Sequence, residues 1–225
     1  MLEDVDLELA QGEFLCVMGP SGSGKTTLLH LLSGLDAPSA GSVELGGQDM
    51  ASLTAGQRTR LRRKSVGYVF QFFNLLPNLN VEENIGLPLA IAGSRPEKRS
   101  GEIAQLAERL GLTERLGAFP HQLSGGEMQR TSIARALIGG QELLLCDEPT
   151  GNLSQKAGAE VMALLRAAVD EDGRTVMLVT HNPRDAAFAD RVEFLVDGKL
   201  QAEAGLRGPD IAVESVHAAL AGLAI

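Results

Sequence analysis

The chain has 225 residues, 44% of them apolar, which is enough to bury a substantial core in one domain. Its 20 basic and 29 acidic side chains give a net charge of −9, which excludes a general electrostatic attraction for nucleic acid or anionic lipid. Acidic residues interrupt the first positions and no run of about 18 apolar residues follows, so we expect neither a signal peptide nor a membrane-spanning helix.

The first part of the chain predicts strands around a glycine-rich segment. Residues 5–9 alternate between apolar and acidic side chains, which is typical of a half-exposed strand. Residues 14–18, FLCVM, are continuously apolar and predict a strand that is buried on both faces. The glycine-rich residues 19–24 follow, and residues 25–33 then predict a helix.

The next elements are shorter. Residues 41–48 alternate again and contain Gly46-Gly47, which predicts a short antiparallel strand and turn. Residues 66–70 predict another strand, which ends at Gln71. A basic run precedes this strand, and we interpret it as the solvated face of a helix, with a binding patch as the alternative. The run consists of Arg58, Arg60, Arg62, Arg63 and Lys64.

The character of the sequence changes between residue 72 and about residue 117. Residues 81–92 and 97–110 predict two helices, separated by a loop that contains Gly93 and Pro96. We interpret this helical segment as an insert in the pattern of strands.

Beyond the insert, helices and strands alternate once more. The expected elements are a helix over 124–138, a strand over 143–146, a helix over 154–169, strands over 175–180 and 192–196, a turn at Asp197-Gly198, and a tail of weak helical character from residue 206. Such alternation predicts an α/β layered fold with a parallel sheet. Cys16 and Cys146 lie inside apolar strands, so we expect buried, reduced cysteines of the kind found in a reducing cytosol.

The glycine-rich segment matches the phosphate-binding pattern GxxxxGK[ST] completely. Its glycines let backbone N–H groups point inward at phosphate oxygens, and the following helix adds its positive end. We expect Lys25 to reach the β- and γ-phosphates and the hydroxyl of Thr26 to ligate Mg²⁺. A chance glycine-rich turn is the alternative, but the strand before and the helix after supply the required context. The predicted nucleotide-binding residues are Gly19, Pro20, Ser21, Gly22, Ser23, Gly24, Lys25, Thr26 and Thr27.

Two carboxylates follow the apolar run 143–146 at the end of a predicted strand. In open α/β sheets, ligands bind at the carboxyl ends of the strands. We therefore expect Asp147 to hold Mg²⁺ through water, and Glu148 to orient and deprotonate the attacking water. Taken alone, a strand that ends in Asp-Glu more often begins a solvated loop, but the phosphate-binding segment upstream reverses that interpretation.

Ser124, Gly125 and Gly126 precede a predicted helix and form a second anion-binding helix start, with an ordinary capped helix as the alternative. The eight-residue string LSGGEMQR, residues 123–130, resembles the signature motif of ABC ATPases. This resemblance implies that Ser124, Gly125, Gly126 and Glu127 grip the γ-phosphate that a partner subunit holds.

The resemblance to ABC ATPases extends over nearly the whole chain. Gln71 in YVFQ resembles the Q-loop glutamine, which touches Mg²⁺ or the attacking water and opens the segment that faces a permease. Asp147 and Glu148 in CDEPTGNL resemble the Walker B pair, and His181 in VTHNP resembles the switch histidine that senses the γ-phosphate. A lone histidine at the end of a strand is usually structural, so the role of His181 rests on the resemblance.

Longer strings narrow the resemblance to one branch. GPSGSGKTTLLHLLSGLDAPSAG, GYVFQFFNLLPNLNVEENIGLPL and VTHNPRDAAFADRV resemble the lipoprotein-releasing and macrolide-efflux subfamily, whose permeases carry large extracytoplasmic domains. Two features depart from the family pattern. Family members carry a further segment before the first strand, with an aromatic residue that stacks on adenine. Ser154 stands where the family has an aspartate that faces the partner's phosphate-binding loop.

The resemblance implies the architecture of a P-loop NTPase in the α/β class. It has a RecA-like parallel-sheet core, a short antiparallel β subdomain and an inserted helical subdomain, all within one ABC ATPase domain. We assign residues 1–71 and 131–205 to the core with its β subdomain, 72–130 to the helical subdomain with the signature motif, and 206–225 to a C-terminal tail.

The expected function is that of an ATPase subunit that uses ATP and Mg²⁺, works as a homodimer or pseudo-dimer, and powers an integral-membrane permease. We expect it to be cytoplasmic, peripheral on the inner face of the cell membrane, without a nucleic-acid partner. Two alternatives remain. A regulatory or scaffolding subunit with little hydrolysis is favoured by Ser154 and by the absent aromatic residue. A soluble non-transport ABC ATPase would need long coiled coils or a second cassette, and the sequence contains neither.

Overall fold

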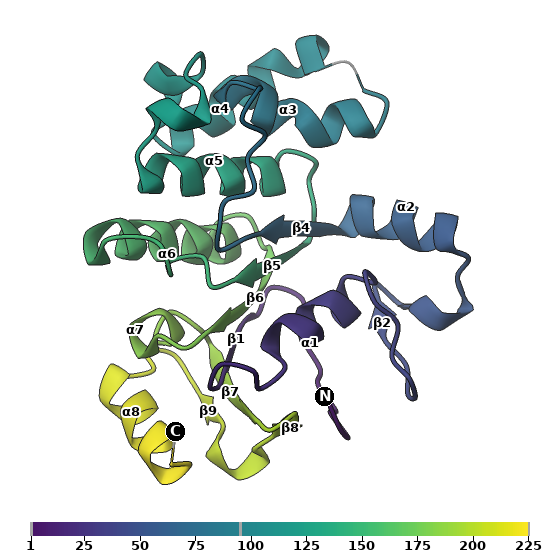
Figure 1. Cartoon of the computed structure of the whole chain (residues 1–225), viewed down its shortest axis with the longest axis vertical. Coiled ribbons are helices and arrows are strands. Elements are labelled where there is room, and N and C mark those ends of the chain that lie inside the picture. The colour runs from purple at the N-terminus through teal and green to yellow at the C-terminus, as the bar shows by residue number, and fades with distance from the viewer. Residues whose placement is uncertain (1, 95, 225) are drawn as a thin grey trace.

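The computed structural model describes residues 2–94 and 96–224. Within them, a seven-stranded and mostly parallel sheet has the neighbour order β4-β5-β6-β1-β7-β8, and β9 pairs with β7 (Figure 1). Only the pairings of β8 and β9 with β7 are antiparallel in this sheet. Its strands are β1 (Phe14–Met18), β4 (Val66–Val69), β5 (Leu143–Asp147), β6 (Thr175–Thr180), β7 (Arg191–Val196), β8 (Lys199–Leu200) and β9 (Leu206–Arg207).

The central strand β1 lies between β6 and β7, and all five of its side chains are buried. Phe14, Cys16 and Met18 join an apolar cluster on one face of the sheet, and Leu15 and Val17 join a second cluster on the other face. Burial on both faces explains why this strand is a continuous apolar run.

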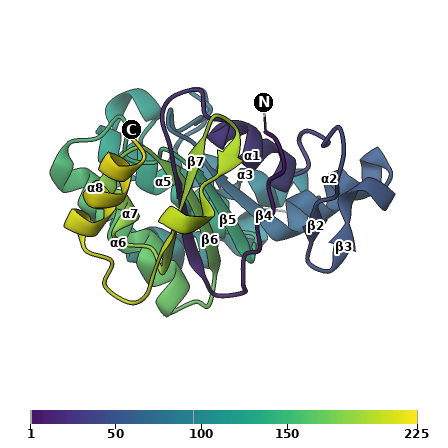
Figure 2. The same ribbon diagram turned by 90° about the horizontal axis from the view of Figure 1, so that it is seen from below.

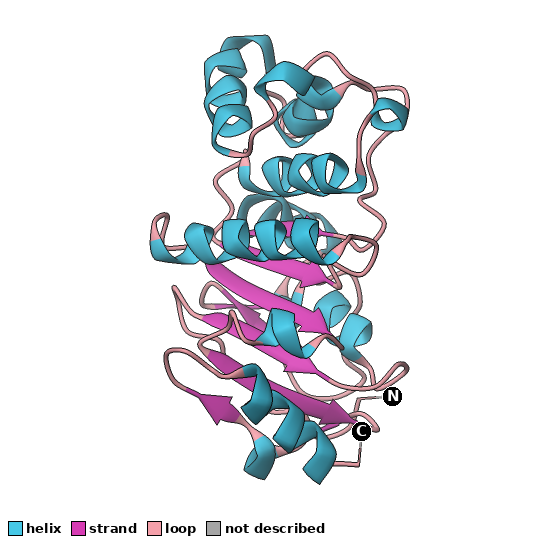
Figure 3. Cartoon of the chain, turned by 90° about the vertical axis from the view of Figure 1, so that its left-hand side faces the viewer, coloured by secondary structure: helices cyan, strands magenta, loops and turns pink. Residues whose placement is uncertain are grey.

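Helices cover both faces of the sheet. Figure 3 looks from the left side of Figure 1 and shows α6, α7 and α8 along one face, whereas α1 lies on the other side. These helices are α1 (Lys25–Leu32), α6 (Gln155–Asp170), α7 (Pro183–Ala186) and α8 (Val213–Gly222). The C-terminal helix α8 buries Val216 completely, so the tail of weak helical character is a helix packed on the domain.

A separate group of helices occupies the top of Figure 1. It contains α3 (Val81–Ile91) and α4 (Ser100–Arg109), which pack near α5 (Gly125–Leu137). The predicted start of the helix over 97–110 is wrong, because a 3₁₀ turn at Pro96–Arg99 precedes α4 and Arg99 provides no side-chain cap. Hydrophobic periodicity does not fix the first turn of an uncapped helix.

A small antiparallel unit projects from the sheet, at the right of Figure 2. β2 (Glu44–Leu45) and β3 (Gln48–Asp49) pair through Gly46 and Gly47, whose φ angles of 58° and 75° suit a two-residue hairpin turn. The helix that follows, α2 (Ala55–Ser65), has no buried residue. Arg60, Arg63 and Lys64 of its basic run are exposed, as predicted, whereas Arg62 is partly buried and donates to the carbonyl oxygen of Gly34 at 3.1 Å.

The predicted strand over residues 5–9 is wrong. The alternation does direct Val5, Leu7 and Leu9 onto the apolar cluster around Leu15, but residues 5–9 pair with no strand among the described residues. Alternation decides which side chains face the core, whereas a strand also needs a neighbouring backbone with free hydrogen-bonding groups.

The expected burial of the two cysteines is confirmed. Cys16 and Cys146 are buried and unpaired, and burial raises the pKa of both thiols. In the part of the chain that the structure describes, no helix is long and apolar enough to cross a membrane.

Candidate functional site

Strand register brings three loops to one edge of the sheet. β1 and β5 both pair with β6 in parallel, which aligns Met18 with Thr180 and Asp147 with Val179. The residues that follow these strand ends therefore lie side by side, at the edge where α/β sheets bind ligands. We call residues 19–26, which follow β1, the phosphate loop.

Two glycines of the phosphate loop occupy positions that disfavour any side chain. A Cβ atom at Gly19 would lie 2.1 Å from the carbonyl oxygen of Leu195. Gly24, which caps α1, has φ of 106°, a conformation that side chains disfavour. Ser21, Gly22, Thr26 and Thr27 are exposed around the N-terminal end of α1. The Oγ atom of Ser23 is buried and has no hydrogen-bond partner among the described residues, which leaves a donor available to a ligand.

Lys25 points into the phosphate loop and is only 7% exposed. Its Nζ atom donates to the carbonyl oxygens of Gly19 at 2.7 Å and Pro20 at 2.9 Å. Burial lowers the pKa of Lys25, while the nearby carboxylates of Glu148 and Asp147 oppose that shift. A buried cation in a loop that leads into the N-terminal end of a helix is suited to hold a polyphosphate.

The carboxylates at the end of β5 have different surroundings. The hydroxyl of Thr26 donates to Oδ1 of Asp147 at 3.4 Å. Burial raises the pKa of Asp147, and the Thr26 hydrogen bond opposes this shift. Glu148 has φ of 43°, and its backbone N–H donates to the carbonyl oxygen of Val179 at 2.9 Å. A non-glycine residue in this conformation is held there by its surroundings, and such residues concentrate at functional sites.

Glu148 faces His181 across the ends of β5 and β6. Oε2 of Glu148 lies 3.1 Å from Nδ1 of His181, and the carboxylate is 18% exposed while the imidazole is 63% exposed. This arrangement leaves most of the imidazole surface accessible beside a fixed carboxylate. The predicted base and the predicted phosphate sensor are thus in direct contact.

Gln71 leaves β4 beside the loop that follows β5. The side chain of Asn152 donates to its carbonyl oxygen at 2.9 Å, and a Cβ atom at Gly151 would lie 2.9 Å from its Nε2 atom. Among the hydrogen bonds of the described residues, none joins the Gln71 side chain to Thr26 or Asp147. The structure therefore places Gln71 next to the carboxylate loop without a direct bond to the predicted metal ligands.

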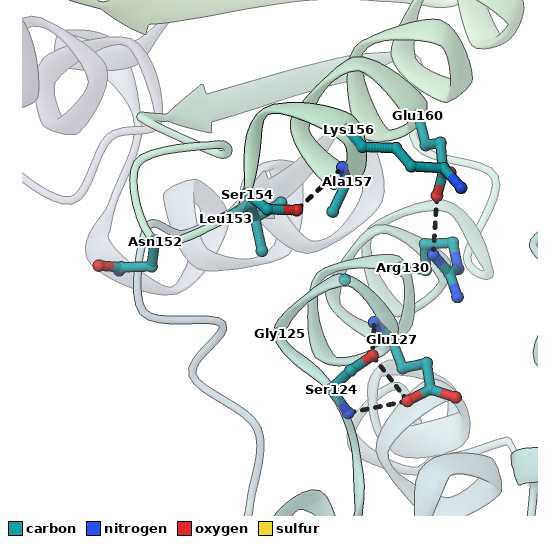
Figure 4. A pocket seen from close by; sticks show the side chains of 11 residues that line it. Ser124, Gly125, Glu127, Arg130, Asn152, Leu153, Ser154, Lys156, Ala157 and Glu160 are labelled. Atoms are coloured by element: carbon teal, nitrogen blue, oxygen red, sulfur yellow. Dashed lines mark hydrogen bonds and ion pairs between the residues drawn. The ribbon is translucent and has the colours of Figure 1, made fainter.

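We call residues 123–130 the signature segment, and its first residues cap α5 (Figure 4). The Ser124 side chain accepts from the Glu127 backbone N–H at 3.3 Å, and the Glu127 carboxylate accepts from the Ser124 backbone N–H at 2.8 Å and from its hydroxyl at 2.7 Å. These bonds, together with Arg115, lower the pKa of Glu127 to about 2.

The signature segment and the start of α6 border one open hollow, which we call the signature hollow (Figure 4). The glycines allow the two helices to approach, because Cβ atoms at Gly125 and Gly126 would lie 3.2 Å from Leu153 and 3.4 Å from Ala157. No residue of the phosphate loop lines the hollow, nor do Asp147, Glu148 or His181. Its lining comprises Ser124, Gly125, Gly126, Glu127, Arg130, Asn152, Leu153, Ser154, Lys156, Ala157 and Glu160.

The sequence did not predict the role of Arg135, which positions the turn after Gln71. Arg135 on α5 donates to the carbonyl oxygens of Asn74 at 2.6 Å and Phe73 at 2.8 Å. Phe73 and Asn74 have φ of 61° and 49°, so this side chain secures a strained turn just after Gln71. No local sequence pattern predicts this contact, because an arginine at position 135 is equally compatible with an ordinary solvent-exposed helix position.

The fold and the site together define a phosphate-loop nucleotide-binding ATPase. The ABC transporter family matches residues 2–151 of this chain. The chain belongs to this family and is an ATPase domain of the ABC class, which confirms the family, the fold class and the kind of enzyme that the sequence predicted.

The chain is similar in sequence to lipoprotein-releasing ATP-binding proteins and to macrolide-export ATP-binding/permease proteins. It is 43% identical over 204 residues to the lipoprotein-releasing system ATP-binding protein LolD of Shewanella sp. (strain MR-4), covering 91% of this chain and 88% of that protein. It is 45% identical over 203 residues to the macrolide export ATP-binding/permease protein MacB 1/2 of Paracoccus denitrificans, covering 90% of this chain and 30% of that protein. The chain spans about a third of the length of the macrolide-export relatives that it matches.

Solved structures share the fold. The dimeric post-hydrolysis state of the ATP-binding cassette MJ0796 bound to ADP and Pi superposes with a TM-score of 0.82 at 39% identity, covering 89% of this chain and 88% of that one. A second dimeric structure of MJ0796, a bacterial ABC transporter cassette, gives a TM-score of 0.81 at 40% identity.

Proposed function

We propose that two copies of this chain bind two ATP molecules between them, hydrolyse them and thereby power a membrane permease. Each site would combine the phosphate loop of one copy with the signature segment of the other. The observation that carries this proposal is that the signature hollow contains no residue of the phosphate loop. Its helix-start N–H groups can therefore serve a nucleotide only if a second copy brings one.

Within one copy, the phosphate loop and Lys25 would hold the β- and γ-phosphates. The loop fits this role because Lys25 is buried among carbonyl oxygens and the Ser23 hydroxyl lacks a protein partner among the described residues. A phosphate oxygen would replace the carbonyl contacts of Lys25 by stronger charge-assisted bonds. Thr27, which is exposed on the first turn of α1, would contribute to the same phosphate-binding helix N-terminus.

Thr26 and Asp147 would hold Mg²⁺, and Gln71 would complete its surroundings. A hydroxyl and a carboxylate 3.4 Å apart are hard oxygen donors of the kind that Mg²⁺ prefers. When bound there, Mg²⁺ would supply positive charge to the β- and γ-phosphates. The Nε2 atom of Gln71 lies 2.9 Å from where a Cβ atom at Gly151 would be, so its amide is beside the loop that follows Asp147 and would have to turn toward the metal ligands.

Glu148 would act as the general base for the attacking water. Its carboxylate is held by the strained backbone at φ of 43° and by its contact with His181 at 3.1 Å. A fixed carboxylate can orient a water molecule and accept its proton as the bond to phosphorus forms. The exposed imidazole of His181 would donate a hydrogen bond toward the γ-phosphate.

The permease would dock on the segment that follows Gln71. Phe72 is 71% exposed and Leu76 is 44% exposed there, and Arg135 fixes the turn between them. We propose a permease of the lipoprotein-releasing or efflux type, since the names of the relatives describe such systems. The chain would then associate with the inner face of the membrane through this permease, and cells that lack the permease should yield it outside the membrane fraction.

A complementation experiment tests the shared site. Lys25→Ala damages the phosphate loop. Ser124→Asp can still accept from the Glu127 backbone N–H, but it loses the donation to the Glu127 carboxylate and places a negative charge where the partner's phosphate would lie. Each variant alone should be inactive. In a mixed dimer both lesions fall in one site and the other site is intact, so mixing equal amounts should restore roughly a quarter of the wild-type rate.

The matched control mixes Lys25→Ala with Glu148→Gln, two lesions of the same half-site. Every mixed dimer then has damage in both sites, and no activity should return. Recovery in the control, or none in the first mixture while both variants remain folded, would contradict a shared site. Wild-type protein that binds ATP but does not hydrolyse it would instead indicate a regulatory subunit.

A further inference from the structure

A buried carboxylate connects the loops that follow β5 and β6. Asp185, on the short helix α7, is 4% exposed. Its Oδ2 atom accepts from the hydroxyl of Thr150 in a short hydrogen bond and from the hydroxyl of Thr180 at 3.5 Å. Its Oδ1 atom accepts from the side-chain amide of Asn182 at 3.0 Å. One side chain thus joins residues from two loops.

This carboxylate forms no ion pair within the described residues. Burial raises the pKa of Asp185, while the Thr150, Asn182 and Thr180 hydrogen bonds and the nearby charge of His181 oppose the shift. A carboxyl group in such surroundings is costly compared with an apolar side chain of similar volume. Stability alone therefore gives little reason for an aspartate at this position.

The connected residues lie immediately beside the catalytic pair. Thr150 is two positions after Glu148, and Asn182 directly follows His181. The Asn182 backbone N–H also donates to the Thr180 hydroxyl at 3.0 Å, which closes the network around the end of β6. A substitution at Asp185 that displaces Thr150 or Asn182 would therefore also displace Glu148 or His181, which are at most two residues away in the chain.

Thr150 is itself held in place by α6. A Cβ atom at Gly158 would lie 3.4 Å from the Cβ atom of Thr150, so the helix packs closely against this side chain. Thr150 is 8% exposed. The Thr150 hydroxyl, which donates to Asp185, is therefore held in a buried and closely packed position.

We propose that Asp185 is a positioning residue for ATP hydrolysis, which holds the loops after β5 and β6 in register so that Glu148 and His181 stay in contact. The inference rests on the proposed function, because it assigns Glu148 the role of base. Among the described residues, Asp185 forms no hydrogen bond or ion pair with either member of the pair, and we infer that it acts through Thr150, Thr180 and Asn182. Displacing catalytic groups by about 1 Å lowers turnover by about 10²-fold, so the expected effect is on kcat.

The test measures kcat and KM for Mg-ATP in the full-length chain. Asp185→Leu should lower kcat by about 10- to 100-fold with KM nearly unchanged. Thr150→Val, which removes one hydrogen bond at similar volume, should lower kcat in the same direction by less. Arg184→Ala on the same helix is the matched control and should leave both constants unchanged, because its side chain is exposed.

The most specific test exchanges the side chains of Asp185 and Asn182 and measures kcat. Asp185→Asn and Asn182→Asp each disturb the bond between the two side chains, but the double variant restores it with donor and acceptor reversed. The double variant should recover most of the wild-type kcat, a rescue that a purely structural loss would not show.

Wild-type kcat in both Asp185→Leu and Thr150→Val would overturn the inference while leaving the proposed function intact. A kcat that falls in the single variants without any recovery in the double variant would also overturn it. A wild-type protein without ATPase activity would overturn both proposals together.

Discussion

The phosphate loop and the signature segment are both helix starts with serine and glycine, but the fold treats them differently. The phosphate loop receives side chains from other strand ends, because Asp147 bonds Thr26 and Glu148 contacts His181 beside it. In the signature segment, Ser124 and Glu127 bond each other in a capping box, and the segment opens onto a hollow without any of these residues (Figure 4).

We interpret this difference as that between a site assembled by one chain and the half of a site that we propose a second copy completes. Parallel strands that end at the same edge of a sheet place their carboxyl-terminal residues together without help from a partner. The signature segment lies instead on α5, between the sheet and the helices at the top of Figure 1. Damage to the first region should therefore change chemistry and binding within one copy, whereas damage to the second should change communication between copies.

The largest effect is expected from Glu148→Gln, which keeps the shape of the side chain and removes the base. Loss of general-base assistance should slow ATP hydrolysis by on the order of 10²–10⁴-fold. ATP should still bind, so the variant should accumulate as an ATP-bound dimer. Steady-state ATPase assays and size-exclusion chromatography measure both results, and turnover near the wild-type rate would exclude Glu148 as the base.

Lys25→Ala should weaken ATP binding by about 2–5 kcal/mol, because truncating one partner of a buried charge pair leaves the other unpaired. The wild-type side chain already bonds Gly19 and Pro20 inside the loop, so the variant should also lose some order there. Calorimetry with Mg-ATP measures the affinity. Wild-type affinity in this variant would show that residues 19–26 do not hold the phosphates.

Ser154→Asp tests the second region. Ser154 caps α6 by accepting from the Ala157 backbone N–H at 3.4 Å, and it lines the signature hollow. Aspartate can cap the same helix, so the fold should be preserved. A charged group would replace a neutral bond to the partner by a charge-assisted one, worth about 1 kcal/mol more. The Hill coefficient or the turnover rate measured with the permease should rise, and no change in either would show that Ser154 does not limit coupling.

The smallest effect concerns the capping box itself. The folded-state pKa of Glu127 is lowered from 4.5 to about 2, so its charge stabilises the folded protein above pH 4.5 and this contribution is lost as the pH falls toward about 2. Glu127→Gln should lower Tm near neutral pH by no more than about 2–4 °C, the size of a helix-end charge effect. The difference in Tm from wild type should shrink as the pH falls below 4.5, whereas a constant difference would show that charge is not its cause.

Much of the fold could be predicted because several elements carry strong local signals. The apolar run of β1 and the strand β6 have the predicted bounds, and Ser124 caps α5 as expected. The prediction of a strand over residues 5–9 failed. The alternation correctly indicated which side chains pack on the core, but this segment pairs with no strand among the described residues. The predicted start of α4 was also too early, because no capping side chain marks that end.

The assignment of the domain boundaries and of the site residues remains a prediction, although the structure brings several predicted side chains together. Lys25, Thr26, Asp147, Glu148 and His181 lie around one edge of the sheet. Gln71 lies beside them without a direct bond. The helix α5 runs continuously across the proposed boundary between residues 130 and 131.

The sequence by itself determined the family, the phosphate loop and the signature segment, because each depends on residues that are adjacent in the chain. Only the tertiary structure decided which distant side chains meet. Asp185 reaches Thr150 over 35 positions, and Arg135 reaches Asn74 over 61. These contacts depend on strand order and helix packing, which no local pattern encodes. The same reason explains why the roles of Glu148 and His181 could be predicted by resemblance, whereas the hydrogen bonds of Asp185 beside them became visible only in the folded chain.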